Sequence, residues 1–435
     1  MLLDCFRAAA CALSLAAVLV AQSEDGYNPN QRIQRIRELA KRDSQAVPAL
    51  AEYLGDPNRD IRIEAVKAIV KLDTERSLGP LAKATHDTDS EVQIRATDGL
   101  INYYVPGYVA KGGLTGSLTR GVRQVKGFFS SRNDQIIDPD VTIRPEVAQA
   151  LADEIGAAAG SDARANAALA AGILRDRAAV PALVQALHSK DNQTLFESLV
   201  ALQKIHDPAA VPGILFLTHD LDDRIQATAL ETVGVLHGET AAPDVRSALS
   251  HARNDRVRRA ALEALAMLAV SADRATFQSY LKDNDPELRA SALEGLGRIR
   301  DPEDTPALDE AYNEKDADWR VHLAAAFALV DEGKVDASEF SPLPYLVENL
   351  DAKGRSGVAQ PYLSELARRE EVRRALFPLV AQATRDQKIA LCAVFSASQN
   401  EDVIPVLKTL SRDIDPAVSL AAARGLRILE ARKLS

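Results

Sequence analysis

A pattern that returns about every 31 residues limits what this chain can fold into more than any other feature of its sequence. It is clearest from Asp285 to Leu296, where Asp285 can cap a helix and Pro286 suits the first helical position. Apolar residues then form one helical stripe: Leu288, Ala292, Leu293 and Leu296. Positions equivalent to Leu288 are Ile61, Val92, Ala163, Thr194, Ile225, Val257, Trp319 and Val418. A fixed period of this length predicts stacked helical repeats.

Three strings carry a resemblance to a known family: Asn58–Ala65, Asp285–Ala292 and Asp415–Ala422. They resemble HEAT repeats, including the short bacterial HEAT-like form of the phycobilisome-lyase type. The resemblance extends from about Ala46 to Leu429. It implies an all-α fold, an α-solenoid of about eleven antiparallel helix pairs in a HEAT-like superhelix with one irregular insertion. In such a fold the second helix of each pair lines the concave face.

The charge balance narrows the classes of partner. The 435 residues include 52 Lys and Arg against 62 Asp and Glu, for a net charge of −10. A solenoid that binds nucleic acid needs a strongly basic groove, so we expect no nucleic-acid partner. Aromatic residues make up only 5% of the chain, which suits thin layers of closely packed helices.

The chain divides into five parts. Residues 1–21 read as a signal peptide, because Arg7 precedes an apolar run that ends in small residues near Ala21. The other parts are a polar linker with a capping helix at 22–45, two repeats at 46–102, a basic Gly-rich insertion at 103–142, and repeats from 143 to 435. We therefore expect an exported protein of the periplasm or cell envelope. A buried first helix and an uncleaved membrane anchor remain alternatives for the first segment.

Polar residues recur at the turns. We call Leu288 and its equivalent positions the anchors of the repeats. Eight polar residues stand three positions before an anchor: Asn58, Asp89, Asp191, Asp222, Asn254, Asp285, Asp316 and Asp415. Several form Asp-x-Asp pairs, which could suggest calcium, but no site continues with the residues of an EF-hand loop. We therefore predict that they cap the second helices. Seven prolines near the start of the first helices are interpreted as residues of the first helical turn, where proline breaks no hydrogen bond of the helix: Pro48, Pro80, Pro181, Pro212, Pro243, Pro306 and Pro405.

An arginine follows the anchor in several repeats and predicts a structural ladder: Arg62, Arg164, Arg258, Arg289 and Arg320. Each could bond to a turn aspartate in its own or the next layer. Gln93, Gln226 and Ser419 interrupt the ladder. Cys392, at an apolar position, is interpreted as a small core residue.

The insertion holds the residues on which we place any functional contact. Between Lys111 and Arg132 it is basic, without an acidic residue, and it carries an apolar stripe at helical spacing. The candidates for binding a partner or an anionic membrane are Lys111, Arg120, Arg123, Lys126, Phe128, Phe129 and Arg132. Its glycines disfavour a stable helix, so a segment that is disordered until it binds is one alternative. A lid folded over the acidic repeats is another.

The residues give little support to an enzymatic function. HEAT-like deoxyhypusine hydroxylases bind iron through His-Glu steps, but none of the seven histidines here is followed by Glu. A bilin-lyase-like activity lacks a suitable thiol, because only Cys392 follows the export segment. We therefore expect no catalytic residue, no metal and no cofactor. The predicted function is a non-enzymatic exported scaffold that binds a protein or peptide along the concave second-helix surface. The hydroxylase-like or lyase-like enzyme and a peripheral membrane scaffold are the alternatives.

Overall fold

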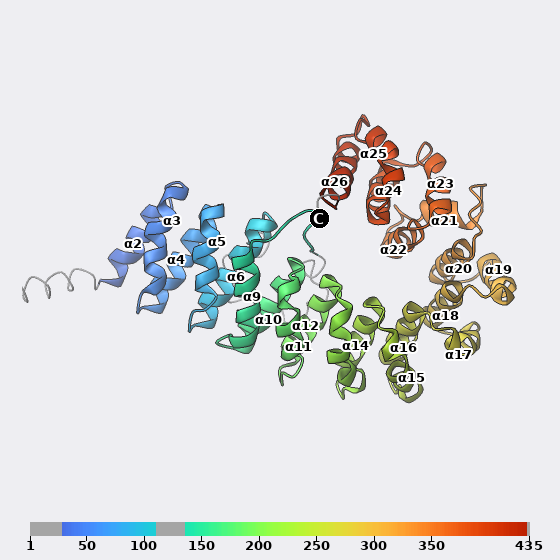
Figure 1. Cartoon of the computed structure of the whole chain (residues 1–435), viewed down its shortest axis with the longest axis horizontal. Helices are drawn as coiled ribbons and strands as arrows, with labels where there is room; N and C mark the ends of the chain where they lie inside the picture. The colour runs from blue at the N-terminus through green and yellow to red at the C-terminus, as the bar shows by residue number, and fades with distance from the viewer. Residues whose placement is uncertain (1–27, 110–134, 433–435) are drawn as a thin grey trace, which may run out of the picture. The chain divides into compact units, whose positions relative to one another are not determined.

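The computed structural model describes residues 28–109 and 135–432, and within these ranges it contains helices, 3₁₀ turns and loops but no strand. The prediction of an all-α solenoid of about eleven helix pairs is confirmed (Figure 1). Each pair has a first helix, a short turn and a second helix. The chain separates into two compact units, with one boundary inside a helix between Ala201 and Leu202.

Unit 1 comprises residues up to 137 and residues 143–201. A single helix, α2 (Pro29–Leu39), precedes the pairs and packs against α4. The pairs are α3 (Val47–Ala51) with α4 (Arg59–Leu72), α5 (Glu75–Ala84) with α6 (Ser90–Tyr104), α9 (Pro145–Ala157) with α10 (Ser161–Ile173), and α11 (Val180–Ala186) with α12 (Asn192–Ile205). Its 3₁₀ turns are η1 (Ser44–Ala46), η2 (Glu52–Gly55) and η3 (Arg177–Ala179).

The 103–142 segment interrupts the chain but not the stack of unit 1. Helix α5 packs against α9 and α6 packs against α10, although about 40 residues separate the two pairs in sequence. At the near end, Tyr108 is buried in the core. At the far end, the Ile137 amide donates to the Ile173 carbonyl at 2.9 Å. The two ends of the insertion are therefore fixed to the repeats on either side.

Unit 2 comprises residues 202–435 and residues 138–142. Its pairs are α13 (Val211–Ile214) with α14 (Asp223–Val235), α15 (Ala242–His251) with α16 (Asp255–Leu268), α17 (Arg274–Tyr280) with α18 (Pro286–Ile299), α19 (Thr305–Asn313) with α20 (Trp319–Asp331), α21 (Pro342–Glu348) with α22 (Ser356–Leu366), α23 (Glu370–Leu379) with α24 (Arg385–Ser398), and α25 (Ile404–Leu410) with α26 (Pro416–Arg432). Its 3₁₀ turns are η4 (Pro208–Ala210), η5 (Leu215–His219), η6 (Glu239–Ala241), η7 (Ser271–Asp273), η8 (Pro302–Asp304) and η9 (Glu401–Val403). In Figure 1, α14, α16 and α18 lie side by side in one layer, with α15 and α17 in the other.

The second helices begin where the turn residues predict. Side-chain oxygens of seven predicted caps accept backbone N–H groups of the first turn: Asn58, Asp89, Asp191, Asp222, Asn254, Asp285 and Asp415. In the four Asp-x-Asp pairs, the first carboxylate accepts the amide of the second aspartate at 2.8–3.0 Å. The pairs thus shape the turn and cap the helix, as predicted.

One predicted cap and its anchor are wrong by two residues. Asp318, not Asp316, caps α20, and its carboxylate accepts the Arg320 amide at 2.9 Å. The buried anchor of this repeat is therefore Val321, and Trp319 is the first helical residue. Its half-buried indole lies under the guanidinium groups of Arg320 and Arg355. The repeat is two residues longer here, because α19 has nine residues where α17 has seven, and this keeps a large ring out of a position that smaller side chains fill elsewhere.

Six of the seven predicted prolines lie in the first turn of a helix: Pro48, Pro181, Pro212, Pro243, Pro306 and Pro405. Pro80 does not, because α5 begins at Glu75 and the proline stands inside it. Cys392 is buried as predicted. Burial, together with the nearby Asp413 carboxylate, raises the pKa of its thiol to about 12.

Candidate functional site

The seven insertion residues expected to bind a partner or membrane all lie in 110–134, outside the described residues. Lys111, Arg120, Arg123, Lys126, Phe128, Phe129 and Arg132 therefore stay a prediction. The structure does place the predicted arginine ladder and reveals two polar sites that the sequence did not single out.

The ladder position is the residue directly after the anchor, four residues after the cap, and in α24 it holds Lys388. At three ladder positions a cation binds an acid of the next layer, 25 residues later in the chain. Arg62 Nε lies 2.7 Å from Asp87, Arg289 Nη2 lies 2.5 Å from Glu314, and Lys388 Nζ lies 2.9 Å from Asp413. Each bond joins the start of one second helix to the turn of the following pair. These contacts tie neighbouring layers together.

The residue at the ladder position also donates a hydrogen bond to a backbone carbonyl at the end of the first helix of its own pair. Arg289 Nε donates to the Leu281 carbonyl at 3.1 Å, and Arg164 Nε donates to the Ile155 carbonyl at 3.0 Å. Gln226, His322 and Ser419 make the corresponding contact to the carbonyl eight residues before them. Gln226 and Ser419 interrupt the row of arginines, as predicted from the sequence. The hydrogen bond to the carbonyl nevertheless continues through these repeats, because the Gln226 amide and the Ser419 hydroxyl replace the guanidinium.

Two predicted members of the ladder take other partners. Arg258 pairs with Asp255 of its own helix at 2.5 Å. Arg320 bonds to the cap Asp318 at 3.1 Å, and its shifted register explains the difference, because His322 holds the ladder position in that repeat. The contacts of Arg62, Arg164 and Arg289 join separate structural elements, whereas the bonds of Arg258 to Asp255 and of Arg320 to Asp318 stay within one helix and its cap.

A row of carboxylates runs along the second helices of unit 2. Glu231, Glu263 and Glu294 occupy the same place in α14, α16 and α18, six residues after the anchors Ile225, Val257 and Leu288. We call these three the carboxylate row. Burial raises the pKa of Glu263 to about 8, and repulsion from Glu294 and Glu231 adds to it. Burial also raises the pKa of Glu231.

One end of the carboxylate row meets a network from two later helices. Arg298 Nε and Nη2 each lie 2.9 Å from a Glu365 oxygen, and Nη1 lies 3.0 Å from Glu294. The Tyr362 hydroxyl donates to Glu294, and its ring stacks on Phe327 with centroids 4.6 Å apart. Burial raises the pKa of Tyr362 well above its usual value, and the Glu294 carboxylate adds to the shift. The network fixes Glu294, while Glu263 stands between two other acids.

The sequence contains a signal for this row. The spacing of 32 and 31 residues between the three glutamates matches the repeat period, and the equivalent places in other repeats hold Lys67, Asp98, Leu169, Val200, Phe327 and Arg424. Tyr362 and Glu365 gave no such signal, since they lie about 70 residues from Glu294 in an irregular repeat.

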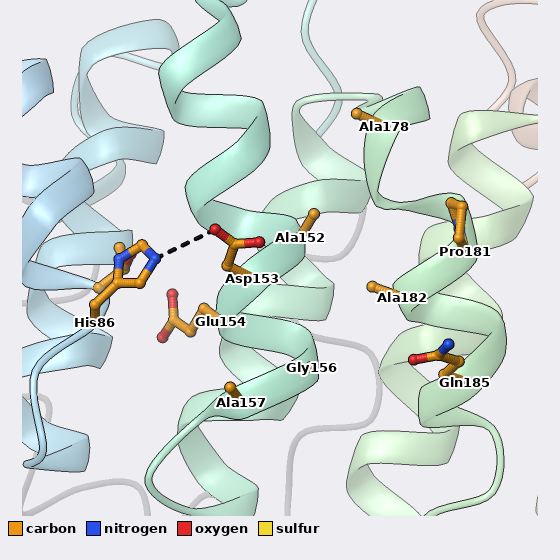
Figure 2. A pocket seen from close by; sticks show the side chains of 11 residues that line it. His86, Ala152, Asp153, Glu154, Gly156, Ala157, Ala178, Pro181, Ala182 and Gln185 are labelled. Carbon is orange, nitrogen blue, oxygen red and sulfur yellow. Dashed lines mark hydrogen bonds and ion pairs between the residues drawn. The ribbon is translucent and has the colours of Figure 1, made fainter.

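The second site is an open pocket of about 550 Å³ in unit 1. Figure 2 shows its polar wall, where His86 from the end of α5 faces Asp153 and Glu154 of α9. Small residues form the rest: Ala152, Gly156, Ala157, Ala178, Pro181 and Ala182, with Thr85 and Gln185 at the edges. His86 Nε2 lies 3.3 Å from an Asp153 oxygen.

Glu154 is the unusual member of this pocket. Its side chain is only 2% exposed, and Oε2 accepts the Thr97 hydroxyl of α6 at 2.6 Å. Its other oxygen has no hydrogen-bond partner among the residues that the structure describes. Burial raises its pKa well above the ordinary value, and the nearby Asp98 charge adds to the shift. A buried polar atom without a partner costs about 1–3 kcal/mol, so its presence calls for a function or a bound group.

Among the described residues, no group of three or more His, Cys, Asp and Glu side chains has the arrangement of a metal site. Nor does any of their helices combine the length and apolar character needed to cross a bilayer.

Comparison with known proteins gives a family likeness. The family model for HEAT repeats matches residues 16–101 and 242–330. No curated protein matches the sequence. Importin beta is 15% identical over 90% of this chain and 58% of that one, with a TM-score of 0.43. An engineered protein of solved structure is 18% identical over 88% of this chain and 98% of that one, with a TM-score of 0.38. The CpcE–CpcF complex of phycocyanin lyase from a Nostoc species is 19% identical over 66% of this chain and 94% of that one, with a TM-score of 0.36. The chain therefore carries HEAT repeats in these two regions, and its observed helix pairs form the α-solenoid that such repeats build.

Proposed function

We propose that this chain is a non-enzymatic, exported scaffold that binds a protein or peptide partner along the second-helix face of unit 2. The observation that carries the proposal is the carboxylate row. Its three acids stand in register on adjacent helices. Burial raises the pKa of Glu263 and Glu231, and at Glu263 repulsion from the neighbouring acids adds to the shift. A partner segment with Lys or Arg side chains would supply the missing cations.

The geometry favours an extended partner. Neighbouring second helices in such a stack lie about 8–10 Å apart, so the row presents acids at a repeated spacing rather than in one pocket. Cations on every second or third residue of an extended peptide, about 7–10 Å apart, match that spacing. Export to the periplasm or cell envelope, from the signal-like residues 1–21, is part of the same proposal.

Site-specific photo-cross-linking in the native host tests this. A photoreactive residue at Val235 or Arg256, on the second helices, should yield an adduct that mass spectrometry identifies as one partner. The same residue at Ser279 or Glu310, on the first helices, should yield none of it. Adducts only from the first-helix positions would refute the choice of surface.

A charge-matched pair of variants separates specific recognition from general acidity. Changing the row (Glu231→Gln, Glu263→Gln, Glu294→Gln) should abolish the adduct. Changing three exposed carboxylates of the first-helix layer (Glu239→Gln, Glu310→Gln, Glu348→Gln) alters the net charge equally and should leave it. Metal analysis of the purified protein tests the hydroxylase alternative, which requires stoichiometric iron.

A further inference from the structure

We propose that the pocket of unit 1 binds a primary alkylammonium group, with the nitrogen between Asp153 and Glu154 and the alkyl chain on the alanines of α9 and α11. This site is separate from the carboxylate row and does not depend on the function proposed for it. It is built from a cavity, a buried acid with an unpartnered oxygen, and a wall of small apolar residues.

The charges on the pocket wall favour a cation. Asp153 and Glu154 are adjacent on α9, and Asp98 lies close enough to affect Glu154. Among the described residues that line the pocket there is no lysine or arginine. An anion would face these acids without a counter-charge, whereas a cation would allow Glu154 to ionise and would bind its free oxygen.

His86 does not supply that cation to Glu154. Its Nδ1 lies 3.2 Å from the Ala82 carbonyl and from Thr85 Oγ1, whose hydroxyl already donates to Ala82, so Nδ1 must be the donor. Its Nε2 faces Asp153. The imidazole therefore contacts Asp153 at the rim and not Oε1 of Glu154, whose other oxygen accepts the Thr97 hydroxyl.

The apolar wall selects an alkyl chain behind the nitrogen. Ala152, Gly156 and Ala182 offer no hydrogen-bonding side chain, and they leave room for a chain of several methylene groups. A volume of about 550 Å³ lies within the usual range of about 300–1,000 Å³ for small-ligand sites. A lysine side chain and a free alkylamine share this chemistry, and the experiment distinguishes them.

Calorimetry on the full chain provides the test, with n-butylammonium as the probe and 1-butanol as its uncharged isostere. Butylammonium should bind and butanol should bind at least about tenfold more weakly, since hydrogen bonds to charged groups contribute about 1.5–3 kcal/mol. Ionisation of Glu154 on binding should release a proton, measured as a difference in heat between two buffers of unequal ionisation enthalpy. Equal affinity for the two compounds, or no binding of butylammonium, would overturn the proposal.

The chain offers well-matched variants. Glu154→Gln keeps the bond from Thr97 but cannot ionise, so it should weaken butylammonium at least about tenfold and remove the proton release. Gly156→Leu should block the pocket without strain, because a Cβ on Gly156 meets nothing within 4 Å. Gly79→Leu is its control, a helical glycine in α5 with equal space and no place in the pocket. Unchanged binding by Gly156→Leu would contradict the site.

A second pair of probes identifies the source of the ammonium group. The blocked tripeptide Ala-Lys-Ala is compared with Ala-Gln-Ala, in wild type and in Gly156→Leu. If the lysine peptide binds at least as tightly as butylammonium, the pocket receives a lysine of a protein. If only butylammonium binds, the ligand is a small amine. Either result supports the site, and binding of both peptides equally well would speak against it.

Discussion

The close approach of α18 and α20 allows a stability prediction for a single methyl group. Gly297 lies in α18 at its crossing with α20. A Cβ built on it would stand 2.5 Å from both Cα and Cβ of Ala328. Ordinary carbon contacts are about 3.5–4.0 Å, so Gly297→Ala requires the two helices to separate by about 1 Å or more. The obstacle includes backbone, which cannot turn aside as a flexible side chain does.

The expected cost follows from two opposing effects. Overpacking of this kind costs about 1–3 kcal/mol, and the backbone clash places it at the upper end. Alanine gains about 1 kcal/mol over glycine in helix propensity. We therefore expect Gly297→Ala to lose about 2 kcal/mol. Gly156→Ala, where the new Cβ meets nothing within 4 Å, keeps the propensity gain alone and should be stabilised by up to about 1 kcal/mol.

Hydrogen exchange is the suitable assay, because a solenoid can open layer by layer and local protection reports the affected layer directly. A loss of about 2 kcal/mol should speed exchange of the α18 and α20 amides about 30-fold. Amides of α4 and α6 should exchange as in wild type. Equal protection of α18 in Gly297→Ala and wild type would refute the reasoning, since it would mean that the two helices are not packed at this distance.

Three further predictions rest on buried groups. Arg373, 2% exposed, binds Asp402 and the carbonyls of Ala367 and Arg368, so Arg373→Met should lose about 3 kcal/mol in urea unfolding, whereas the exposed Arg374→Met should change little. The folded-state pKa of Glu263, raised from 4.5 to about 8, means that its contribution is most favourable below pH 4.5 and is lost as pH rises toward 8. Glu263→Gln should therefore gain more stability relative to wild type at pH 8 than at pH 5, and an equal gain at both would contradict this. In a Cys5→Ser/Cys11→Ser background, Cys392 should react with a thiol reagent only when urea unfolds its helix, and rapid labelling of the native protein would contradict its burial.

The sequence predicted the repeats well because their signals are local. A cap such as Asp285, a proline after it and an apolar stripe all act within one helix, and the structure confirms them. The start of α20 was predicted two residues too early for a physical reason. Asp316 and Asp318 satisfy the same local capping rule, and only packing against neighbouring helices decides which one begins the helix. The choice that buries Val321 leaves the larger Trp319 half-exposed.

The two candidate sites depend on contacts that a local pattern does not contain. Glu154 is buried because Thr97, 57 residues earlier and across the insertion, packs over it. Glu294 is fixed by Arg298 of its own helix and by Tyr362, which lies 68 residues later in another pair. Only the carboxylate row left a trace in the sequence, through its matching spacing. The residues that the sequence did nominate, in 110–134, lie outside the described part of the chain.

A solenoid of this kind can carry two independent sites because each layer contacts mainly the layers near it. Buried or half-buried acids, such as Glu154 in one unit and Glu263 in the other, are stabilised or strained by nearby helices of their own unit. The cost of each is therefore local, and other repeats can supply the stability of the chain. Acids in such positions are thus informative about function, whereas the caps and the arginine ladder report on the stack. It follows that Gly156→Leu should leave partner binding by the carboxylate row intact, and that removing the row should leave butylammonium binding intact.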